Sequence, residues 1–459
     1  MDTIKLYFTT FGDVYPGMDY PNERFPNKRI IVPPNKITEY RKLNHQDITL
    51  DEIKKYAKVF PSSAYVREVW QEEIPDNNAL IEREDWGNEY NRKDMFIIGA
   101  GASAKCVDKS RKKEFGNDNL SPPLGNGLFK SKLQYIYDKY QGITDVIHDL
   151  QDENINVEEY LEKEWEKVVE NGSQTVMSRH INIQFYLQEL LMKISDRVST
   201  EYYNVNLYAE LAKKLKEIND KDSKRHFAFV SFNQDTILED CLSKSFGLPP
   251  LTDMDSYLET DKKPFCVYKP HGSCNWGWKF PNKVANPQKE LFDNRTNFYK
   301  LYFEILGNRT EMVDKSSYGD EVVRDKHGVG KVTVNKSKIV CFEQESALDY
   351  YPAILLPYRD KDEFTLPPDH YEDLTFYISG VENLYIIGWK GNEALFNKVF
   401  KECKAEGKEA VKLKRVIIVD PEAKMVKENI KELLDDGVCV TPYDGGFQDF
   451  INRGLKELD

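Results

Sequence analysis

The chain has 459 residues, 40% of them hydrophobic and 12% aromatic, and its formal net charge is -13 at pH 7. This length exceeds a usual single core and the composition is that of a packed protein, so we expect two lobes or one domain with large insertions rather than a disordered chain. The acidic balance disfavours direct, charge-driven binding of nucleic acid, because phosphate contacts need clustered Lys and Arg.

The seven cysteines are scattered along the chain and never form a CxxC pair. This pattern is typical of reduced thiols in the cytoplasm and not of a disulfide framework. The first residues show no basic segment followed by a long apolar run, and no stretch reaches the roughly 18 apolar residues that a membrane helix requires. We therefore expect a cytoplasmic protein without a membrane segment.

Residues 1–94 form a charged, proline-punctuated extension with mixed α and β signals. Residues 4–10 and 29–32 are expected to be short strands, and residues 49–60 a helix that Thr49 caps. No chemistry is evident in this extension. Oligomerisation or partner docking and a structural lid over the main core remain alternative interpretations of it.

The main domain is expected to span residues 95–459, with mostly helical residues at 143–222 inserted into it. In that insertion apolar residues recur at helical spacing. Residues 279–350 are polar and are expected to add loops and a hairpin, which would pair residues 331–334 with 338–342. Short apolar runs that end at polar or glycine turns indicate buried strands of a mostly parallel sheet, so we expect an α/β fold. These runs are residues 95–98, 227–232, 265–268, 384–387 and 416–419.

Gly99 and Gly101 follow the first of these strands. Closely spaced glycines at a strand end let backbone N–H groups approach a pyrophosphate at the start of the next helix, where Ser103 would add a hydroxyl. Ala104 stands where the third glycine of GxGxxG belongs, and no acidic strand end follows at the spacing of a hydride-transfer domain. A tight strand–helix turn without a ligand is the alternative interpretation.

Asn233 and Asp235 lie just past the strand at residues 227–232. Open α/β sheets place ligand groups at such strand ends. The Asn233 amide can donate to and accept from a ribose hydroxyl or a nucleophilic water. Asp235 either orients that amide or caps the following helix.

His271 lies on a turn after the strand at residues 265–268, next to Gly272 and Ser273. Its imidazole titrates near neutral pH, which suits a general base. Two later strands end at Gly388 and Asp420, which would bring backbone and small polar groups to the same sheet edge, suitable for a ribose or adenine. Simple turn formation explains Gly388 and Asp420 equally well.

In this order the segments resemble the SIR2 family over roughly residues 95–450. The resemblance is carried by residues 99–103 (GAGAS), 122–129, Asn233-x-Asp235, 270–273 (PHGS), Gly388 and 416–421 (VIIVDP). It implies a Rossmann-like NAD-binding sheet in which Asn233 and His271 form the catalytic pair, with Asp235 beside them. The residues that would contact NAD are Gly99, Ala100, Gly101, Ser103, Gly272, Ser273, Gly388 and Asp420.

Sirtuin deacylases carry a zinc ribbon of two CxxC pairs after the catalytic histidine, and this chain lacks both pairs, so no zinc is expected. The chain more closely resembles the zinc-less SIR2-like proteins of bacterial anti-phage defence. That resemblance implies a homo-oligomer that hydrolyses NAD+ to nicotinamide and ADP-ribose when triggered, with a HerA-like ATPase, a short Argonaute or a phage protein as activating partner. An NAD-dependent deacylase or ADP-ribosyltransferase and a non-catalytic scaffold that binds NAD or ADP-ribose remain alternatives.

Overall fold

The computed structural model describes residues 91–107, 121–129, 140, 142–150, 155–171, 174–258, 263–284, 348–356, 365–406 and 411–458, and the short strands at 5–8, 14–16, 28–31, 58–61, 67–70, 310–312, 320–324 and 330–334. The chain divides into two compact units, which are described separately. One contains Ile81–Leu128, Leu187–Trp276 and Thr365–Asp459, and the other contains Met1–Leu80, Phe129–Tyr186 and Gly277–Phe364. The predicted division at residues 94 and 95 stays a prediction.

A six-stranded sheet, in which all neighbouring strands are parallel, organises the first unit. Its order is β16-β15-β14-β6-β7-β8, so the chain adds β7 and β8 on one side of β6 and then crosses to add β14, β15 and β16 on the other. This is the doubly wound order, whose switch point lies between β6 and β14. The predicted α/β, Rossmann-like, mostly parallel sheet is confirmed. The strands are β6 (Asn91–Ile98), β7 (Arg225–Ser231), β8 (Phe265–Tyr268), β14 (Asn383–Ile387), β15 (Arg415–Val419) and β16 (Cys439–Tyr443).

Aromatic side chains stack across the central strands. Phe96 on β6 is fully buried, and its ring centroid lies 5.0 Å from that of Phe229 on β7 and 4.5 Å from that of Tyr385 on β14. Phe96 is in register with both residues. Because helices cover both faces of a parallel sheet, its strands read as continuous apolar runs, which is why the sequence pattern located them.

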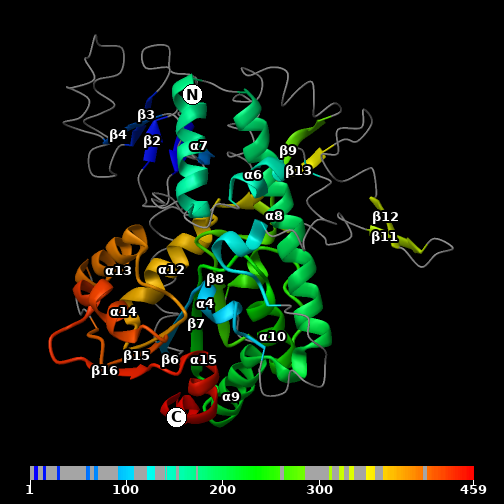
Figure 1. Cartoon of the computed structure of the whole chain (residues 1–459). Helices are drawn as coiled ribbons and strands as arrows, with labels where there is room; N and C mark the ends of the chain where they lie inside the picture. The colour runs from blue at the N-terminus through cyan, green and yellow to red at the C-terminus, as the bar shows by residue number, and fades with distance from the viewer. Residues whose placement is uncertain are drawn as a thin grey trace. The chain divides into compact units, whose positions relative to one another are not determined.

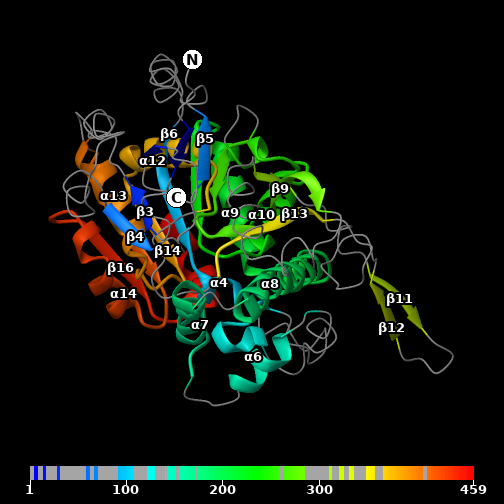
Figure 2. The same cartoon turned by 90° about the horizontal axis from the view of Figure 1, so that it is seen from above.

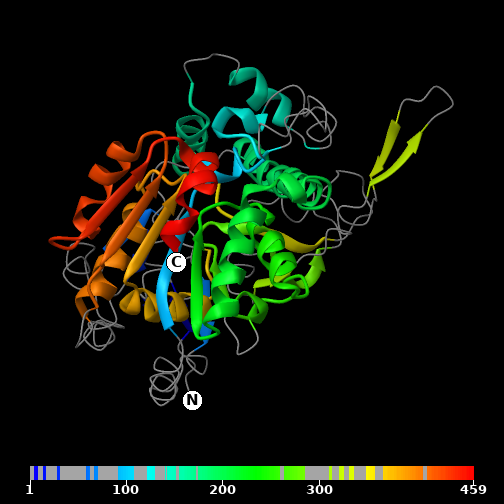
Figure 3. The ribbon, with the colours of Figure 1, turned by 90° about the horizontal axis from the view of Figure 1, so that it is seen from below.

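Helices pack beside the sheet in two groups, with β6 and β7 between them (Figures 1 and 3). In one group α9 packs against α10 and contacts β7, and in the other α12 packs against α13 and contacts β6. Asn206 caps the start of α9, because its Oδ1 accepts a hydrogen bond from the Tyr208 N–H at 2.9 Å. The helices are α9 (Leu207–Lys221), α10 (Ile237–Phe246), α12 (Pro368–Gly380), α13 (Ala394–Glu406), α14 (Ala423–Asn429) and α15 (Gly446–Asp449).

Asp94 joins three strands near the amino end of the sheet. Its buried carboxylate accepts hydrogen bonds from Arg225 Nε at 2.7 Å, Asn383 Nδ2 at 3.0 Å and the Tyr385 hydroxyl at 3.2 Å. These donors come from β7 and β14, the two neighbours of β6. The network fixes the strands at the edge opposite the predicted site.

Helices fill most of the stretch predicted to be helical, residues 143–222. They are α6 (Ile143–Asp149), α7 (Val157–Asn171), α8 (Gln174–Glu201) and α9. Of the apolar positions that suggested the pattern, Ile183, Leu187 and Leu190 are buried. No helix in the described ranges is long and apolar enough to cross a membrane.

The structure corrects two predictions about short elements. The hairpin pairs β11 (Asp320–Arg324) with β12 (Gly330–Val334), as Figure 2 shows, and residues 338–342, the predicted partner, lie outside the described residues. β4 (Lys58–Pro61) is a strand where the end of a helix was predicted; it pairs with β3 (Lys28–Ile31), and cross-strand pairing of this kind overrides a weak local helix pattern. The start of that predicted helix lies outside the described residues.

The remaining strands form two small sheets of three strands each. β9 continues past residue 279, where loops were predicted, and forms a three-stranded sheet with β10 and β13. A second three-stranded sheet has the order β2-β1-β5. The strands are β1 (Lys5–Phe8), β2 (Val14–Pro16), β5 (Arg67–Trp70), β9 (Gly272–Val284), β10 (Thr310–Met312) and β13 (Leu348–Ile354).

Candidate functional site

Two glycine turns meet at the switch point of the sheet. The Gly99 N–H donates to the Ile387 carbonyl and the Gly101 N–H to the Gly388 carbonyl, each at 3.0 Å. A Cβ on Gly99 would lie 2.5 Å from the Gly388 oxygen, so this approach of backbone to backbone admits no side chain. The two N–H groups are therefore used within the chain. Ala100, between the glycines, is exposed.

Asn233 lies immediately beyond β7 and is oriented by contacts to the β6 turn. Its Nδ2 donates to the Gly99 carbonyl at 3.0 Å and to Ser103 Oγ at 2.8 Å. A carbonyl can only accept, so the Gly99 contact identifies which end of the amide is the nitrogen. Asn233 Oδ1 is buried and has no hydrogen-bond partner within the described residues.

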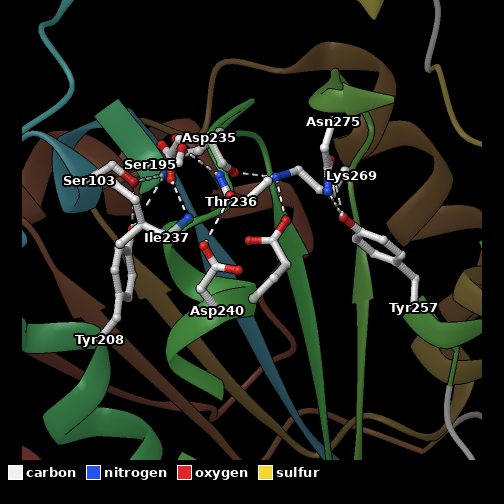
Figure 4. Close-up of polar contacts among 12 residues, drawn as sticks. Ser103, Ser195, Tyr208, Asp235, Thr236, Ile237, Asp240, Tyr257, Lys269 and Asn275 are labelled. Atoms are coloured by element: carbon white, nitrogen blue, oxygen red, sulfur yellow. Dashed lines mark hydrogen bonds and ion pairs between the residues drawn. The ribbon is translucent and has the colours of Figure 1, made fainter. Parts of the chain in front are cut away.

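Tyr208, in the first turn of α9, adds its hydroxyl to this network. Figure 4 shows the Tyr208 side chain next to Ser103. Its hydroxyl lies 3.0 Å from Ser103 Oγ and 3.4 Å from Asn233 Nδ2. Burial raises the pKa of Tyr208 well above its usual value, so the phenol stays protonated. The sequence analysis did not single out Tyr208, because a tyrosine in an amphipathic helix is indistinguishable from an ordinary core residue.

Asp235 is buried and contacts the start of the helix that follows it. Its Oδ1 accepts from the Ile237 N–H at 3.2 Å, at the start of α10. Burial raises the pKa of Asp235, while the Lys269 charge and a hydrogen bond from Ser103 oppose that rise. Because Ser103 also accepts from Asn233 Nδ2, the serine hydroxyl connects Asp235 with the amide, and an orienting role for Asp235 stays a prediction.

Lys269 forms a buried ion pair with Glu239. Its side chain is 0% exposed, and its Nζ contacts Glu239 Oε1 at 2.5 Å. The same Nζ donates to the Asp235 carbonyl, as Figure 4 shows. Burial raises the pKa of Glu239 to about 7, although Lys269 opposes the rise. The sequence analysis did not identify Lys269 or Glu239. Lys269 stands two residues before His271, and nothing in the neighbouring sequence indicates that it pairs with Glu239.

The pH dependence of stability in a Glu239→Gln variant tests the raised pKa of Glu239. A carboxyl whose pKa is higher in the folded than in the unfolded protein stabilises the fold fully below its unfolded value of about 4.3, and that contribution declines as pH rises to the folded value. Wild-type stability should therefore fall between about pH 5 and 7, by at most ~1.4 kcal/mol per pH unit from this group. In Glu239→Gln this contribution to the pH dependence of the free energy of unfolding should be absent.

The measurement is urea unfolding at pH 5, 6 and 7. Glu217→Gln, which changes an exposed glutamate on α9, serves as the control and should keep the wild-type pH dependence. An identical pH dependence in Glu239→Gln and the wild type would show that Glu239 does not titrate in this range.

His271 lies on the turn between β8 and β9, as predicted. The turn is closed by the Gly272 N–H, which donates to the Lys269 carbonyl at 2.9 Å, and Gly272 has a φ of +75° that favours glycine. The His271 ring is buried, with its centroid 5.0 Å from that of Phe232. Ser273 is also buried, and its Oγ has no hydrogen-bond partner in the described ranges.

An aromatic cluster borders His271. Phe232 stacks on Trp389 at 5.4 Å between centroids, and Phe396 meets both rings edge-on. Phe232 follows β7, Trp389 follows β14 and Phe396 lies on α13, so the cluster joins the strand ends on either side of β6. The sequence analysis did not indicate that these three rings touch.

Gly388 and Asp420 lie at the same sheet edge and are engaged in turns. The Gly388 N–H donates to the Val419 carbonyl at 3.0 Å. Asp420 accepts from the Glu422 N–H at 2.8 Å and from Lys390 Nζ at 3.0 Å. The structure thus connects Asn233 with Ser103 and Asp235, bonds Gly99 to Ile387 and Gly101 to Gly388, and leaves Asp420 paired with Lys390.

Comparison with known proteins gives matches to solved structures alone. No family model and no curated protein sequence matches the chain. Within the described residues no group of three His, Cys, Asp or Glu side chains could hold a metal ion; the expectation of no zinc stays a prediction.

Three of the similar solved structures are sirtuins. Two concern sirtuin substrate affinity: both are 12% identical and cover 82% of this chain, with TM-scores of 0.33 and 0.31 and coverage of 98% and 97% of their own chains. The third, a Sir2 mutant with a p53 peptide and NAD, is 11% identical, has a TM-score of 0.31, and covers 82% of this chain and 97% of its own. At this level of similarity the fold assignment rests on the strand order of the sheet itself.

Proposed function

We propose that this chain hydrolyses NAD+ at the carboxyl edge of its parallel sheet and releases nicotinamide and ADP-ribose. The observation that carries the proposal is the Asn233 amide, whose nitrogen is held by Gly99 and Ser103 while its buried oxygen has no partner within the described residues. A buried acceptor without a donor costs about 1–3 kcal/mol. A ribose hydroxyl or a nucleophilic water would supply that donor.

The place of the amide in the fold supports a dinucleotide as the substrate. Asn233 contacts the turn that follows β6, and this turn borders the switch point between β6 and β14. Doubly wound sheets bind dinucleotides at that crevice. The motif order that resembles the SIR2 family supplies the same expectation from the sequence.

The proposed reaction assigns separate tasks to Asn233 and His271. The bond between nicotinamide and ribose breaks heterolytically, and nicotinamide leaves as a neutral molecule with the bonding electron pair, so acid catalysis is unnecessary. Water adds to the ribose carbon, and one of its protons passes to the His271 imidazole, giving nicotinamide, ADP-ribose and one proton from NAD+ and water. Asn233 would hold the ribose or the water through Oδ1. General-base assistance of this kind contributes about 10²–10⁴-fold to a rate.

Incubation of the purified chain with NAD+ tests the proposal. Chromatography should show nicotinamide and ADP-ribose appearing in equal amounts. Nicotinamide release that needs an acyl-lysine peptide would instead assign a deacylase, and radiolabel transferred to protein would assign an ADP-ribosyltransferase. NAD+ binding without turnover under every condition would assign a non-catalytic scaffold.

An NAD hydrolase without control would deplete NAD in its own cell. We therefore propose that it acts as a defence effector, held inactive by assembly, by its N-terminal region or by the lack of a partner such as a HerA-like ATPase, a short Argonaute or a phage protein. This part of the proposal rests on the family resemblance. Mass in solution and NAD+ turnover with and without each factor test it, and full turnover by the isolated chain that no factor changes would refute the control mechanism.

A further inference from the structure

Lys269 connects the two turns that carry Asn233 and His271. Its Nζ donates to the carbonyl of Asp235, two residues after Asn233, and its own carbonyl accepts from the Gly272 N–H at 2.9 Å to close the His271 turn. One residue therefore contacts the Asn233 turn with its side chain and forms the His271 turn with its backbone. Glu239 on α10 holds the ammonium group at 2.5 Å.

Two further hydrogen bonds join the same turns. The Cys274 N–H donates to the Gln234 carbonyl at 2.7 Å, and Gln234 Nε2 donates to the His271 carbonyl at 3.3 Å. Both involve Gln234, which stands between Asn233 and Asp235. The two turns are thus bonded through the two residues that follow Asn233, Gln234 and Asp235, and Lys269 supplies the charged donor.

Stability alone does not explain a lysine at this position. The Lys269 side chain is 0% exposed and that of Glu239 is 3% exposed. Taking both charges out of water costs several kcal/mol per ion, and uncharged side chains of similar volume often replace such a pair without loss of stability. What an uncharged replacement cannot supply is a strong donor to the Asp235 carbonyl.

We propose that Lys269, held in place by Glu239, is a positioning residue that sets the Asn233 turn against the His271 turn. The inference rests on the proposed function for its effect on turnover, and on the contacts of the described residues for its effect on structure. A misplacement of about 1 Å can cost about 10²-fold in rate even when the chemical groups are all present.

The double variant Lys269→Met, Glu239→Gln separates positioning from stability. It removes both buried charges at nearly constant volume, so we expect it to unfold at a higher temperature than the single variant Lys269→Met, which leaves one charge buried alone. We expect kcat for NAD+ to fall by ~10- to 100-fold with KM changed less than about threefold. The single variant Lys269→Met leaves Glu239 buried without its partner and should lose both stability and turnover. Wild-type kcat in the double variant would overturn the inference.

Amide hydrogen exchange tests the same contact without any turnover. In the double variant, exchange should become faster at the amides of Gly272 and Cys274, and should stay at the wild-type rate in β6. Lys263→Met is the matched control, because Lys263 is also buried and donates to a backbone carbonyl, that of Phe265 at 2.6 Å, at the other end of β8. It should leave exchange at Gly272 and Cys274 unchanged.

The two measurements distinguish the possible failures. If the wild type does not turn over NAD+ while exchange accelerates as expected, the proposed function fails and the role of Lys269 stands. If exchange at both amides and kcat match the wild type, the role of Lys269 is refuted and NAD+ hydrolysis stands.

Discussion

His271→Ala and Asn233→Ala are each expected to lower nicotinamide release from NAD+ by about 10²-fold or more while the protein stays folded. His271→Ala removes the proposed base, a contribution of about 10²–10⁴-fold. Asn233→Ala removes the acceptor proposed for the ribose or water, together with the donor that contacts Gly99 and Ser103. Release is measured by chromatography under the conditions in which the wild type is active.

Two variants outside the site serve as controls. His148→Ala changes an exposed histidine on α6, and Asn219→Ala removes an amide that donates to the Arg225 carbonyl at 3.0 Å. Both should retain wild-type release, and circular dichroism with thermal unfolding should show that all four variants are folded. Full activity in a folded His271→Ala or Asn233→Ala protein would contradict the assignment.

Gly388→Ala is expected to have the largest effect on stability, a loss of more than about 4 kcal/mol or failure to fold. Gly388 has a φ of +63°, and a Cβ there would lie 2.2 Å from the Ala102 nitrogen and 2.6 Å from the Gly101 carbonyl carbon. These are backbone atoms of the neighbouring turn, so no side-chain rotation relieves the overlap. Urea unfolding of the purified variant measures the loss.

Gly247→Ala separates the steric overlap from the cost of the backbone conformation. Gly247 has nearly the same φ, +68°, but a Cβ there would meet no atom within 4 Å. The free energy of unfolding of this variant should fall only by the cost of a left-handed backbone conformation, about 1–2 kcal/mol. Equal losses in both variants would mean that the turns after β6 and β14 separate easily, contrary to the backbone contacts observed between them.

The sequence predicted the sheet well because its strands are short apolar runs that end at polar or glycine turns. The bounds of β8 agree with those expected, and β14 and β15 each begin one residue earlier than expected. The same pattern placed Asn233 and His271 at strand ends. Buried parallel strands leave this signal within a few neighbouring residues, so one sequence is enough to detect it.

The partners of these residues could not be predicted, because they come from distant segments. Ser103 and Tyr208 are 105 residues apart in the chain, and Lys269 lies 30 residues from Glu239. Glycine is ambiguous for a related reason. Gly99 and Gly101 were interpreted as a phosphate cradle. In the structure they allow two turns to touch, and a glycine in a sequence is compatible with either role.

The strand order has a consequence for when the site forms during synthesis. Asn233 and His271 belong to the first half of the doubly wound sheet, while the Gly388 carbonyl that accepts from Gly101 belongs to the second. β14 lies beside β6 although Asn383 and Asp94 are 289 residues apart in the chain. A nascent chain therefore carries both proposed catalytic side chains long before it can complete the turn beside them. If the chain is the NAD hydrolase proposed here, its site would stay incomplete until most of the chain has left the ribosome.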